Sequence, residues 1–469
     1  INRINHQMSE YSLKSAKGIY DPSLSLSLKS SVDRQANSGT LQTFEALSNN
    51  MSRQDSYDLG ITQLSPWGQT FTLDWLNIRS KNNSSYSLHE PSYSSDLSLS
   101  TSIPILKGYG FTSTNKYILK ARLDRQTADS TYSRMLRDSL SDVETSYWGL
   151  VYAREQFELT KKALEVAKEF QQETESRISV GTIPPIEKIS ADAQVAAKEE
   201  ELISAQSFVD NNEDILKVVL GIRKESVEWN KTIIPLDIPN VLELDIKEEQ
   251  AIAYALGKRE ELRELALALE KSKIDTKSAQ RDMLPTLTLD GSLRYNGSAG
   301  DYYLEHPISY VDQNFGDAWD QIGHRDYKSW LIGLNFRIPV GNRTQRFIYQ
   351  NYRLAQNAAE ISLEKMWQNI VSEVRNSLRT VKNVEKRIAA ADANLKLQRE
   401  KLEAEKKKYD SGLSTSFNIL SYQNDVLSAE TNLLKAKIDH QLALSSLDKA
   451  EGRYLEARHI ELDIVQYVD

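Results

Sequence analysis

Apolar residues recur at heptad spacing along two long stretches of the chain, residues 136–178 and 374–409. The two stretches share one register, and the first glycines after them, Gly181 and Gly412, stand 231 residues apart. A heptad sustained this far predicts long helices that pack along one another as in coiled coils. A long helix, a glycine and a returning helix that occur twice indicate an internal duplication.

We call each of these two series of heptad positions a ladder. We expect the ladders to lie on helices that cover residues 111–178 and 342–409. At about 1.5 Å of rise per residue, each helix would be roughly 100 Å long. A returning amphipathic helix follows each first glycine and ends forty residues later at a second glycine, Gly221 or Gly452. One such glycine is an ordinary helix end. Two such glycines in one register, each after a helix too long for a globular core, predict a pair of helical hairpins.

A second pattern, the alternation of apolar and polar residues, marks six shorter segments. Their apolar positions are Leu24, Leu26 and Leu28; Tyr57, Leu59 and Ile61; Phe71, Leu73 and Trp75; Leu97, Leu99, Ile103 and Ile105; Leu287, Leu289, Leu293 and Tyr295; and Trp330, Ile332, Leu334, Phe336 and Ile338. Period-two apolarity predicts strands with one apolar and one polar face. Each segment is near the ~10 residues that cross a bilayer at a tilt, although a surface sheet packed on a core is an alternative.

The connections between these segments are unequal. Residues 35–54, 80–93 and 297–326 are long and polar, whereas the join at residues 65–68 is tight. Long loops at one end and short turns at the other are typical of outer-membrane barrels. Aromatic residues gather in or beside the strands, as in interfacial girdles, or as in an ordinary core. They are Trp67, Trp75, Tyr86, Tyr93, Tyr310, Trp319 and Trp330.

The two patterns divide the chain into two repeats. In the first we expect a helix over residues 1–21, four barrel strands over 22–105 and a helical hairpin over 106–221 with its tip at 180–182. An equatorial linker over 222–245 connects the two repeats. The second repeat comprises a helix over 246–284, two barrel strands over 285–340 and a hairpin over 341–452 with its tip at 411–413. An equatorial segment over 453–469 follows it. Because Ile1 falls inside the expected helix, we expect residues upstream, where a secretory signal or a lipidated cysteine are both open alternatives.

Composition and motifs exclude several classes of function. The net charge of −8 leaves no basic face for nucleic acid. The absence of cysteine excludes disulfides, thiol catalysis and thiolate metal sites. The six histidines are scattered without HExxH spacing, and neither a GxSxG nor a P-loop motif occurs. We therefore expect no enzyme activity, no cofactor and no metal site.

The order and duplication of these features resemble the TolC-like outer-membrane efflux proteins, or outer-membrane factors. The resemblance is carried by the tip segments 179–182 (Ser-Val-Gly-Thr) and 409–413 (Tyr-Asp-Ser-Gly-Leu), and by the alanine-rich stretch 248–256. It implies an α+β membrane protein in which three protomers share one β-barrel in the outer membrane, while long coiled-coil helices form a hollow periplasmic tunnel. Such a homotrimer passively exports substrates that an inner-membrane pump (RND, ABC or similar) and a periplasmic adaptor deliver, in tripartite efflux or type I secretion.

The number of strands departs from this family's usual four per protomer. Pro22 and Gly181 are 159 residues apart, whereas Pro285 and Gly412 are 127 apart, so the first half has 32 extra residues. Residues 55–86 can supply them as one hairpin. Six strands per protomer would make an eighteen-stranded barrel; if the segment is instead an extracellular excursion, twelve remain.

The resemblance also implies roles for residues at the tips. The adaptor-docking turns would be Val180, Gly181 and Thr182, and Ser411, Gly412 and Leu413. At the periplasmic gate, a tyrosine latch would join Tyr409 to Glu187. Two positions that can hold a ring of aspartates hold Asn418 and Ser421, and the position of an additional basic latch residue holds Ser414. We therefore expect an uncharged ring and a channel that opens more readily than a fully latched relative.

Two other classes of function stay under consideration. One is a surface-anchored adhesin or structural protein with a coiled-coil stalk, and the other is a cytosolic scaffold of long helices. Membrane-length apolar strands argue against the scaffold. Duplication of the whole strand and helix unit argues against the adhesin. The exported substrate is not specified by any motif.

Overall fold

The computed structural model describes residues 2–36, 50–83, 87, 89–237, 239–240, 246–305 and 308–460. Some residues with predictions lie outside the described residues. They are Ile1, Tyr86, residues 238 and 241–245 of the expected linker, the end of the C-terminal segment and parts of the expected long loops. The chain forms two compact units. One is built from Arg3–Ala128 and Ala266–Ile361, and the other from Asp129–Leu265 and the chain from Ser362 onward.

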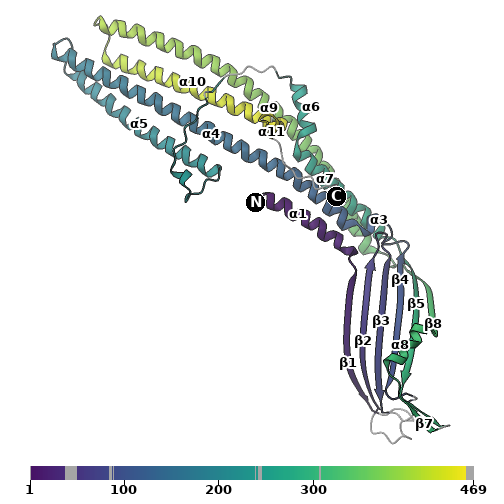
Figure 1. Ribbon diagram of the computed structural model, residues 1–469. Helices are drawn as coiled ribbons and strands as arrows, with labels where there is room; N and C mark the ends of the chain where they lie inside the picture. The colour runs from purple at the N-terminus through teal and green to yellow at the C-terminus, as the bar shows by residue number, and fades with distance from the viewer. Residues whose placement is uncertain are drawn as a thin grey trace. The chain divides into compact units, whose positions relative to one another are not determined.

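The first unit contains an antiparallel sheet of six strands in the order β1-β2-β3-β4-β5-β8 (Figure 1). The strands are β1 (Ser23–Gln35), β2 (Asn50–Leu64), β3 (Thr70–Asn82), β4 (Ser92–Pro104), β5 (Thr286–Gly300) and β8 (Tyr327–Arg337). Four come from the first half of the chain and two from the second, and the β4–β5 pair joins the halves. The β2–β3 hairpin pairs with β1 and with β4, so these strands belong to the sheet and form no separate excursion.

The strand register aligns the alternating apolar and polar residues of all six strands in matching rows. One row of paired neighbours consists of Leu24, Ile61, Leu73, Leu99, Leu293 and Trp330. The adjacent row, on the opposite side, is Ser25, Gly60, Asp74, Ser98, Arg294 and Ser329. We call these sides the apolar face and the polar face. The apolar side chains lie open, with Leu24 70% and Trp330 71% exposed, which a sheet packed on a core would not show.

Part of the segment expected as one long polar loop, 297–326, forms regular structure instead. Strand β5 extends to Gly300, a hairpin of β6 (Tyr302–Glu305) and β7 (Ile308–Val311) follows, and then comes helix α8 (Phe315–His324). A capping box starts α8: the Asn314 side chain accepts from the Gly316 N–H at 2.8 Å, and Asp317 accepts from the Asn314 N–H at 2.7 Å. The long polar connection between β5 and β8 therefore contains regular elements that the sequence pattern did not predict.

The helices account for most of the remaining described chain. They are α1 (Asn2–Lys17), η1 (Gly18–Tyr20), α3 (Phe111–Thr114), α4 (Lys116–Ser179), α5 (Ile186–Val219), η2 (Val227–Asn230), α6 (Glu248–Lys258), α7 (Glu260–Asp282), α9 (Arg343–Asp410), α10 (Ser416–Glu451) and α11 (Tyr454–Ala457). The rods α4 and α9 have 64 and 68 residues. Among the described residues, no helix has the length and apolarity needed to cross a membrane.

The sequence predicted that the first long helix runs unbroken from Phe111, but it does not. It is interrupted at Asn115, which separates α3 from α4. The Asn115 side-chain amide donates to the Pro66 carbonyl at 3.2 Å and accepts from the Tyr20 hydroxyl at 2.5 Å. These bonds hold Asn115 against the β2–β3 turn and η1, so a local polar contact overrides the helix propensity at this point.

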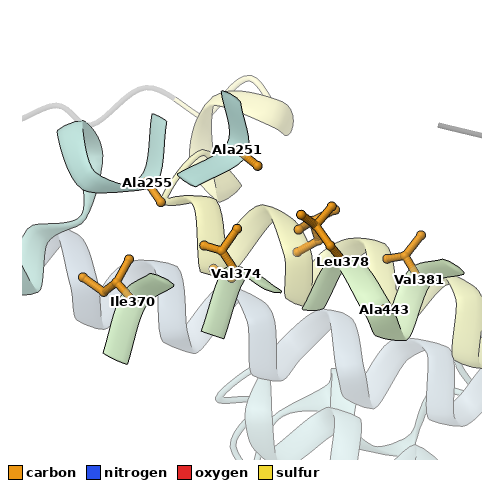
Figure 2. Close-up of a cluster of buried hydrophobic side chains, with 9 residues drawn as sticks. Ala251, Ala255, Ile370, Val374, Leu378, Val381 and Ala443 are labelled. Carbon is orange, nitrogen blue, oxygen red and sulfur yellow. The ribbon is translucent and has the colours of Figure 1, made fainter. Parts of the chain in front are cut away.

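The core of the second unit follows the ladders. Figure 2 shows one cluster, formed by Ala251 and Ala255 of α6, Ile370, Val374, Leu378 and Val381 of α9, and Ala443, Leu447 and Ala450 of α10. Val374 and Val381 are ladder positions, and all described members of both ladders are buried or half-buried. Alanines from two helices let these backbones approach closely, so the cluster is packed by small residues set against branched ones.

A buried histidine in α10 predicts a pH dependence of stability. His440 is fully buried, its Nε2 lies 3.9 Å from a Glu385 carboxylate oxygen, and neither ring nitrogen has a hydrogen-bond partner among the described residues. Burial lowers the pKa of His440, and the nearby Glu385 charge only partly opposes this. The folded state therefore prefers neutral imidazole, and stability that is present above the ordinary pKa of about 6.5 is lost as the pH falls below it.

We expect the unfolding free energy of the wild type to drop between neutral and mildly acidic pH more than that of His440→Leu. Urea unfolding followed by circular dichroism at a series of pH values measures both. The substitution Glu385→Gln removes the opposing charge, so the unfolding free energy of this variant should fall more steeply with decreasing pH than that of the wild type. Parallel pH profiles for wild type and His440→Leu would contradict the prediction.

Candidate functional site

Each helical hairpin ends in a glycine that takes a left-handed conformation. Gly181 has φ of 73° and Gly412 has φ of 76°, values that strain any residue with a Cβ. At the first tip, the N–H groups of Gly181 and Thr182 donate to the carbonyls of Ile178 and Arg177 at 2.9 Å each. This pair of bonds is the Schellman motif, which satisfies the last carbonyls of a helix.

The second tip repeats this geometry. The Gly412 and Leu413 N–H groups donate to the carbonyls of Tyr409 and Lys408, at 3.0 and 2.8 Å. A Cβ at Gly181 or Gly412 would meet nothing within 4 Å, so the turns need the glycine for its backbone angle and leave the space above it open. Such a tip presents its backbone to any partner that approaches.

Apolar side chains flank both turns and are exposed. Val180 is 72% and Leu413 78% exposed, and Phe417, at the start of α10, is 73% exposed. Ile186, which stands 231 residues before Phe417 at the start of α5, is 63% exposed. Large apolar side chains exposed at the end of a hairpin are candidates for a contact surface.

The predicted latch partners, Tyr409 and Glu187, have no hydrogen bond to each other among the contacts of the described residues. Tyr409 is buried against Phe170 of α4, and its hydroxyl lies 3.1 Å from the Ser416 Oγ in its own hairpin. Glu187 is half-buried near the start of α5. The expected latch therefore stays a prediction, and in this structure the tyrosine ring supplies packing between the two hairpins.

A different residue joins the two tips. The Arg177 guanidinium, in the last turn of α4, lies 2.8 Å from an Asp410 carboxylate oxygen at the end of α9. Its Cζ stands 4.8 Å from the centre of the Tyr409 ring, within cation–π range. Arg177 was not predicted from the sequence, because an arginine beside a heptad position looks like any solvated charge.

The other gate residues are polar and locally bonded. The Ser414 hydroxyl donates to Glu405 of the same hairpin at 2.6 Å, and this bond, with Lys408, lowers the pKa of Glu405. The Asn418 amide donates to Ser414 at 3.3 Å, and Ser421 is half-buried. The two ring positions are therefore uncharged, and Ser414 contacts its own hairpin instead of the other one.

Comparison with known proteins decides the family. The family described as "Outer membrane efflux protein" matches residues 72–222 and 251–453, one range for each repeat. The chain belongs to this outer membrane efflux protein family. Each matched range contains one of the two tips. The family is non-enzymatic, in agreement with the lack of catalytic motifs.

The relatives of this efflux protein are distant in sequence but close in fold. The outer membrane protein TolC of Vibrio cholerae is 22% identical over 334 residues, which cover 70% of this chain and 71% of that protein. The outer-membrane channel OprN has a TM-score of 0.69 at 16% identity, covering 96% of this chain and 86% of the other. The Campylobacter jejuni CmeC outer membrane channel has a TM-score of 0.68 at 18% identity, with 97% and 82% covered.

Family membership settles the general function and place of the protein. It is an outer membrane efflux channel of the TolC type that extends into the periplasm, and membership implies a trimeric channel in a tripartite system. The predictions of family, α+β fold, channel function and outer-membrane location are confirmed. The adhesin and scaffold alternatives are excluded.

Proposed function

We propose that this protein is the passive outer-membrane duct of a tripartite efflux or type I secretion system. Six strands from each of three copies close one barrel of eighteen strands in the outer membrane. The helices line a periplasmic tunnel, and the two tips of each copy bind a periplasmic adaptor that belongs to an inner-membrane pump. The observation that carries the proposal is the open six-stranded sheet with an exposed apolar face, in a chain of the efflux family.

The two edges of the sheet supply the physical reason for a shared barrel. The strand order ends at β1 on one side and at β8 on the other. In lipid, each unpaired backbone N–H or C=O costs several kcal/mol, and six strands are fewer than the about eight of the smallest closed barrels. Pairing of β8 with β1 of the next copy satisfies both edges and closes the ring.

We expect cysteines on the two edge strands to link separate copies. Because the chain has no cysteine, Ser329→Cys on β8, combined in turn with Ser23→Cys, Ser25→Cys or Ser27→Cys on β1, introduces the only thiols. At least one pair should give a covalent trimer on a non-reducing gel, because each copy bonds to the next. Ser98→Cys on the internal strand β4, paired with Ser329→Cys, is the matched control and should stay uncrosslinked. A soluble monomer without detergent would contradict the duct.

The exposed apolar tips support adaptor docking. We expect Leu413→Asp combined with Phe417→Asp to weaken adaptor binding by about 2 kcal/mol or more, as for interface hot spots, which is roughly a 30-fold rise in Kd. Export of a fluorescent dye by whole cells measures the consequence, and a photocrosslinker at Leu413 reports the contact. Leu397→Asp on α9, at a position 62% exposed but away from the tips, is the control. Equal export by the tip variant and the control would contradict docking at the tips.

A further inference from the structure

Helix α8 is an amphipathic helix that lies on the apolar face of the sheet (Figure 1). Phe315, Ala318, Trp319 and Ile322 recur at helical spacing on one side, and polar residues such as Asp317 and Asp320 occupy the other. The capping box at Asn314 fixes its start, and Arg325, in the left-handed conformation, ends it. The helix is therefore a defined element of ten residues and has a face to bury.

Its contacts attach it firmly to β3, β4 and β5. The Trp319 indole N–H donates to Asn77 at 2.8 Å, and its ring centre lies 5.4 Å from that of Trp75. The Phe315 ring lies 4.8 Å from Tyr93. The backbone of α8 approaches so closely that a Cβ at Gly297 would stand 1.9 Å from the Ala318 carbonyl oxygen. Glycine at that position is thus required by the helix.

The strand residues under α8 belong to the apolar face. Trp75 and Asn77 follow Leu73 at alternate positions, and Gly297 follows Leu293 in the same way. Asn77 pairs with Ser95, whose hydroxyl donates to the Asn77 side chain at 2.7 Å, and both side chains are buried. Helix α8 therefore covers two polar side chains on the same side of the sheet as the apolar row.

The register also places α8 along the strands. On β5 the apolar-face residues run from Leu287 to Tyr295, and eight steps at about 3.3 Å give roughly 26 Å. At a strand tilt of about 35–45° this length spans roughly 20 Å along the membrane normal, which is most of the ~25 Å apolar band of outer-membrane strands. The side chains under α8 come next, at the opposite end of the strands from Pro104, where β4 ends and the chain continues to α3. The helix thus begins where the apolar band ends.

We propose that α8 is an interfacial helix that lies in the headgroup layer of the outer leaflet, with membrane lipid as its partner. Trp319 remains 44% exposed although it is hydrogen-bonded and stacked, so a large part of the indole faces the surroundings. Tryptophan and tyrosine favour this layer because they present an apolar ring and a polar atom together. Amphipathic helices lie in the same layer, in the plane of the membrane.

The inference rests on the proposed insertion of the sheet in the bilayer, and single cysteines test both separately. Nitroxide labels at Asp320→Cys and Gly323→Cys report on α8, where a Cβ at Gly323 meets nothing within 4 Å. Labels at Leu99→Cys and Ile332→Cys report on the apolar band, and Thr182→Cys gives the aqueous reference. In phosphatidylcholine vesicles, collision with oxygen and with a water-soluble nickel complex measures the depth of each label.

We expect the band labels to lie deep and the α8 labels at the level of the lipid phosphates. Deep band labels together with α8 labels as accessible to nickel as Thr182→Cys would overturn the interfacial helix and leave the inserted sheet intact. Band labels at the aqueous value would overturn both. As an independent readout, Trp319→Phe should reduce quenching by lipids brominated near the headgroup, whereas Trp229→Phe in η2 should not. Equal quenching in Trp319→Phe and wild type would contradict lipid contact.

Discussion

Replacement of Arg177 by alanine is expected to keep the channel open for a larger share of the time. Arg177 joins the ends of α4 and α9 by its ion pair with Asp410 and by its position over the Tyr409 ring. An exposed ion pair contributes about 0.2–1 kcal/mol, and an exposed cation–π contact about 0.5–1 kcal/mol. We expect these contacts to hold the tips together in the closed channel, so their loss should remove about 0.7–2 kcal/mol per protomer from that state and shift the open-to-closed ratio roughly 3- to 30-fold for each protomer.

Single-channel recording in planar bilayers measures this shift as a rise in open probability. Tyr409→Phe should change it little, because the hydroxyl that is removed bonds Ser416 of the same hairpin in the part of the chain that the structure describes. Arg399→Ala is the matched control: it removes an arginine–carboxylate pair with Glu430, at 2.6 Å, within the α9–α10 hairpin. If Arg177→Ala gates like the wild type while Tyr409→Phe opens the channel, the latch is the tyrosine hydroxyl instead.

The regular parts of the fold could be predicted from the sequence because they repeat one physical rule over many residues. A ladder such as the one through Val374 and Val381 must be buried at every turn if two long helices are to pack. The strand of Leu24, Leu26 and Leu28 must likewise turn one side to an apolar environment. The rods, the two tips and the six strands follow from such repetition.

The parts that escaped prediction depend on single contacts between distant segments. The break at Asn115 requires the Pro66 carbonyl, and α8 requires the space above Gly297, and neither neighbour is visible from the local pattern. Arg177 and Asp410 are 233 residues apart in the chain, so nothing in the sequence near either one indicates the ion pair. The capping box at Asn314 and the helical spacing of Phe315, Trp319 and Ile322 are the local signals that could have revealed α8.

Two buried arginines, Arg137 and Arg259, link four helices of the helical unit. Arg137 of α4 is 1% exposed and contacts Glu260 and Glu261, at the start of α7, at 2.7 Å each. Arg259 also binds Glu261, at 2.9 Å, and reaches Glu373 of α9 at 3.1 Å and the Ala450 carbonyl of α10 at 2.9 Å. The group is thus a network in which each carboxylate depends on a buried cation.

The network makes stability depend on acid pH. Burial raises the pKa of Glu261, but the hydrogen bonds and charges of Arg259 and Arg137 outweigh it and lower that pKa to about 2. This stabilisation is present above the ordinary value near 4.3 and is lost as the pH falls from there towards 2. Burial raises the pKa of Glu260, whose contribution therefore has the opposite sign and limits the total.

We expect Arg137→Ala to lower the free energy of unfolding by about 3–5 kcal/mol, because it removes the ion pair of Glu260 with a buried cation and one of the two ion pairs of Glu261. Urea unfolding of the detergent-solubilised protein measures the loss, and the acid limb of the stability profile should move to higher pH as the pKa of Glu261 rises. The double variant Arg137→Met with Glu260→Gln removes the unpaired charge along with the cation, so it should lose less than Arg137→Ala. A loss below about 1 kcal/mol in Arg137→Ala, as for exposed ion pairs, would show that water reaches these carboxylates and that the network adds little to the stability of the rods.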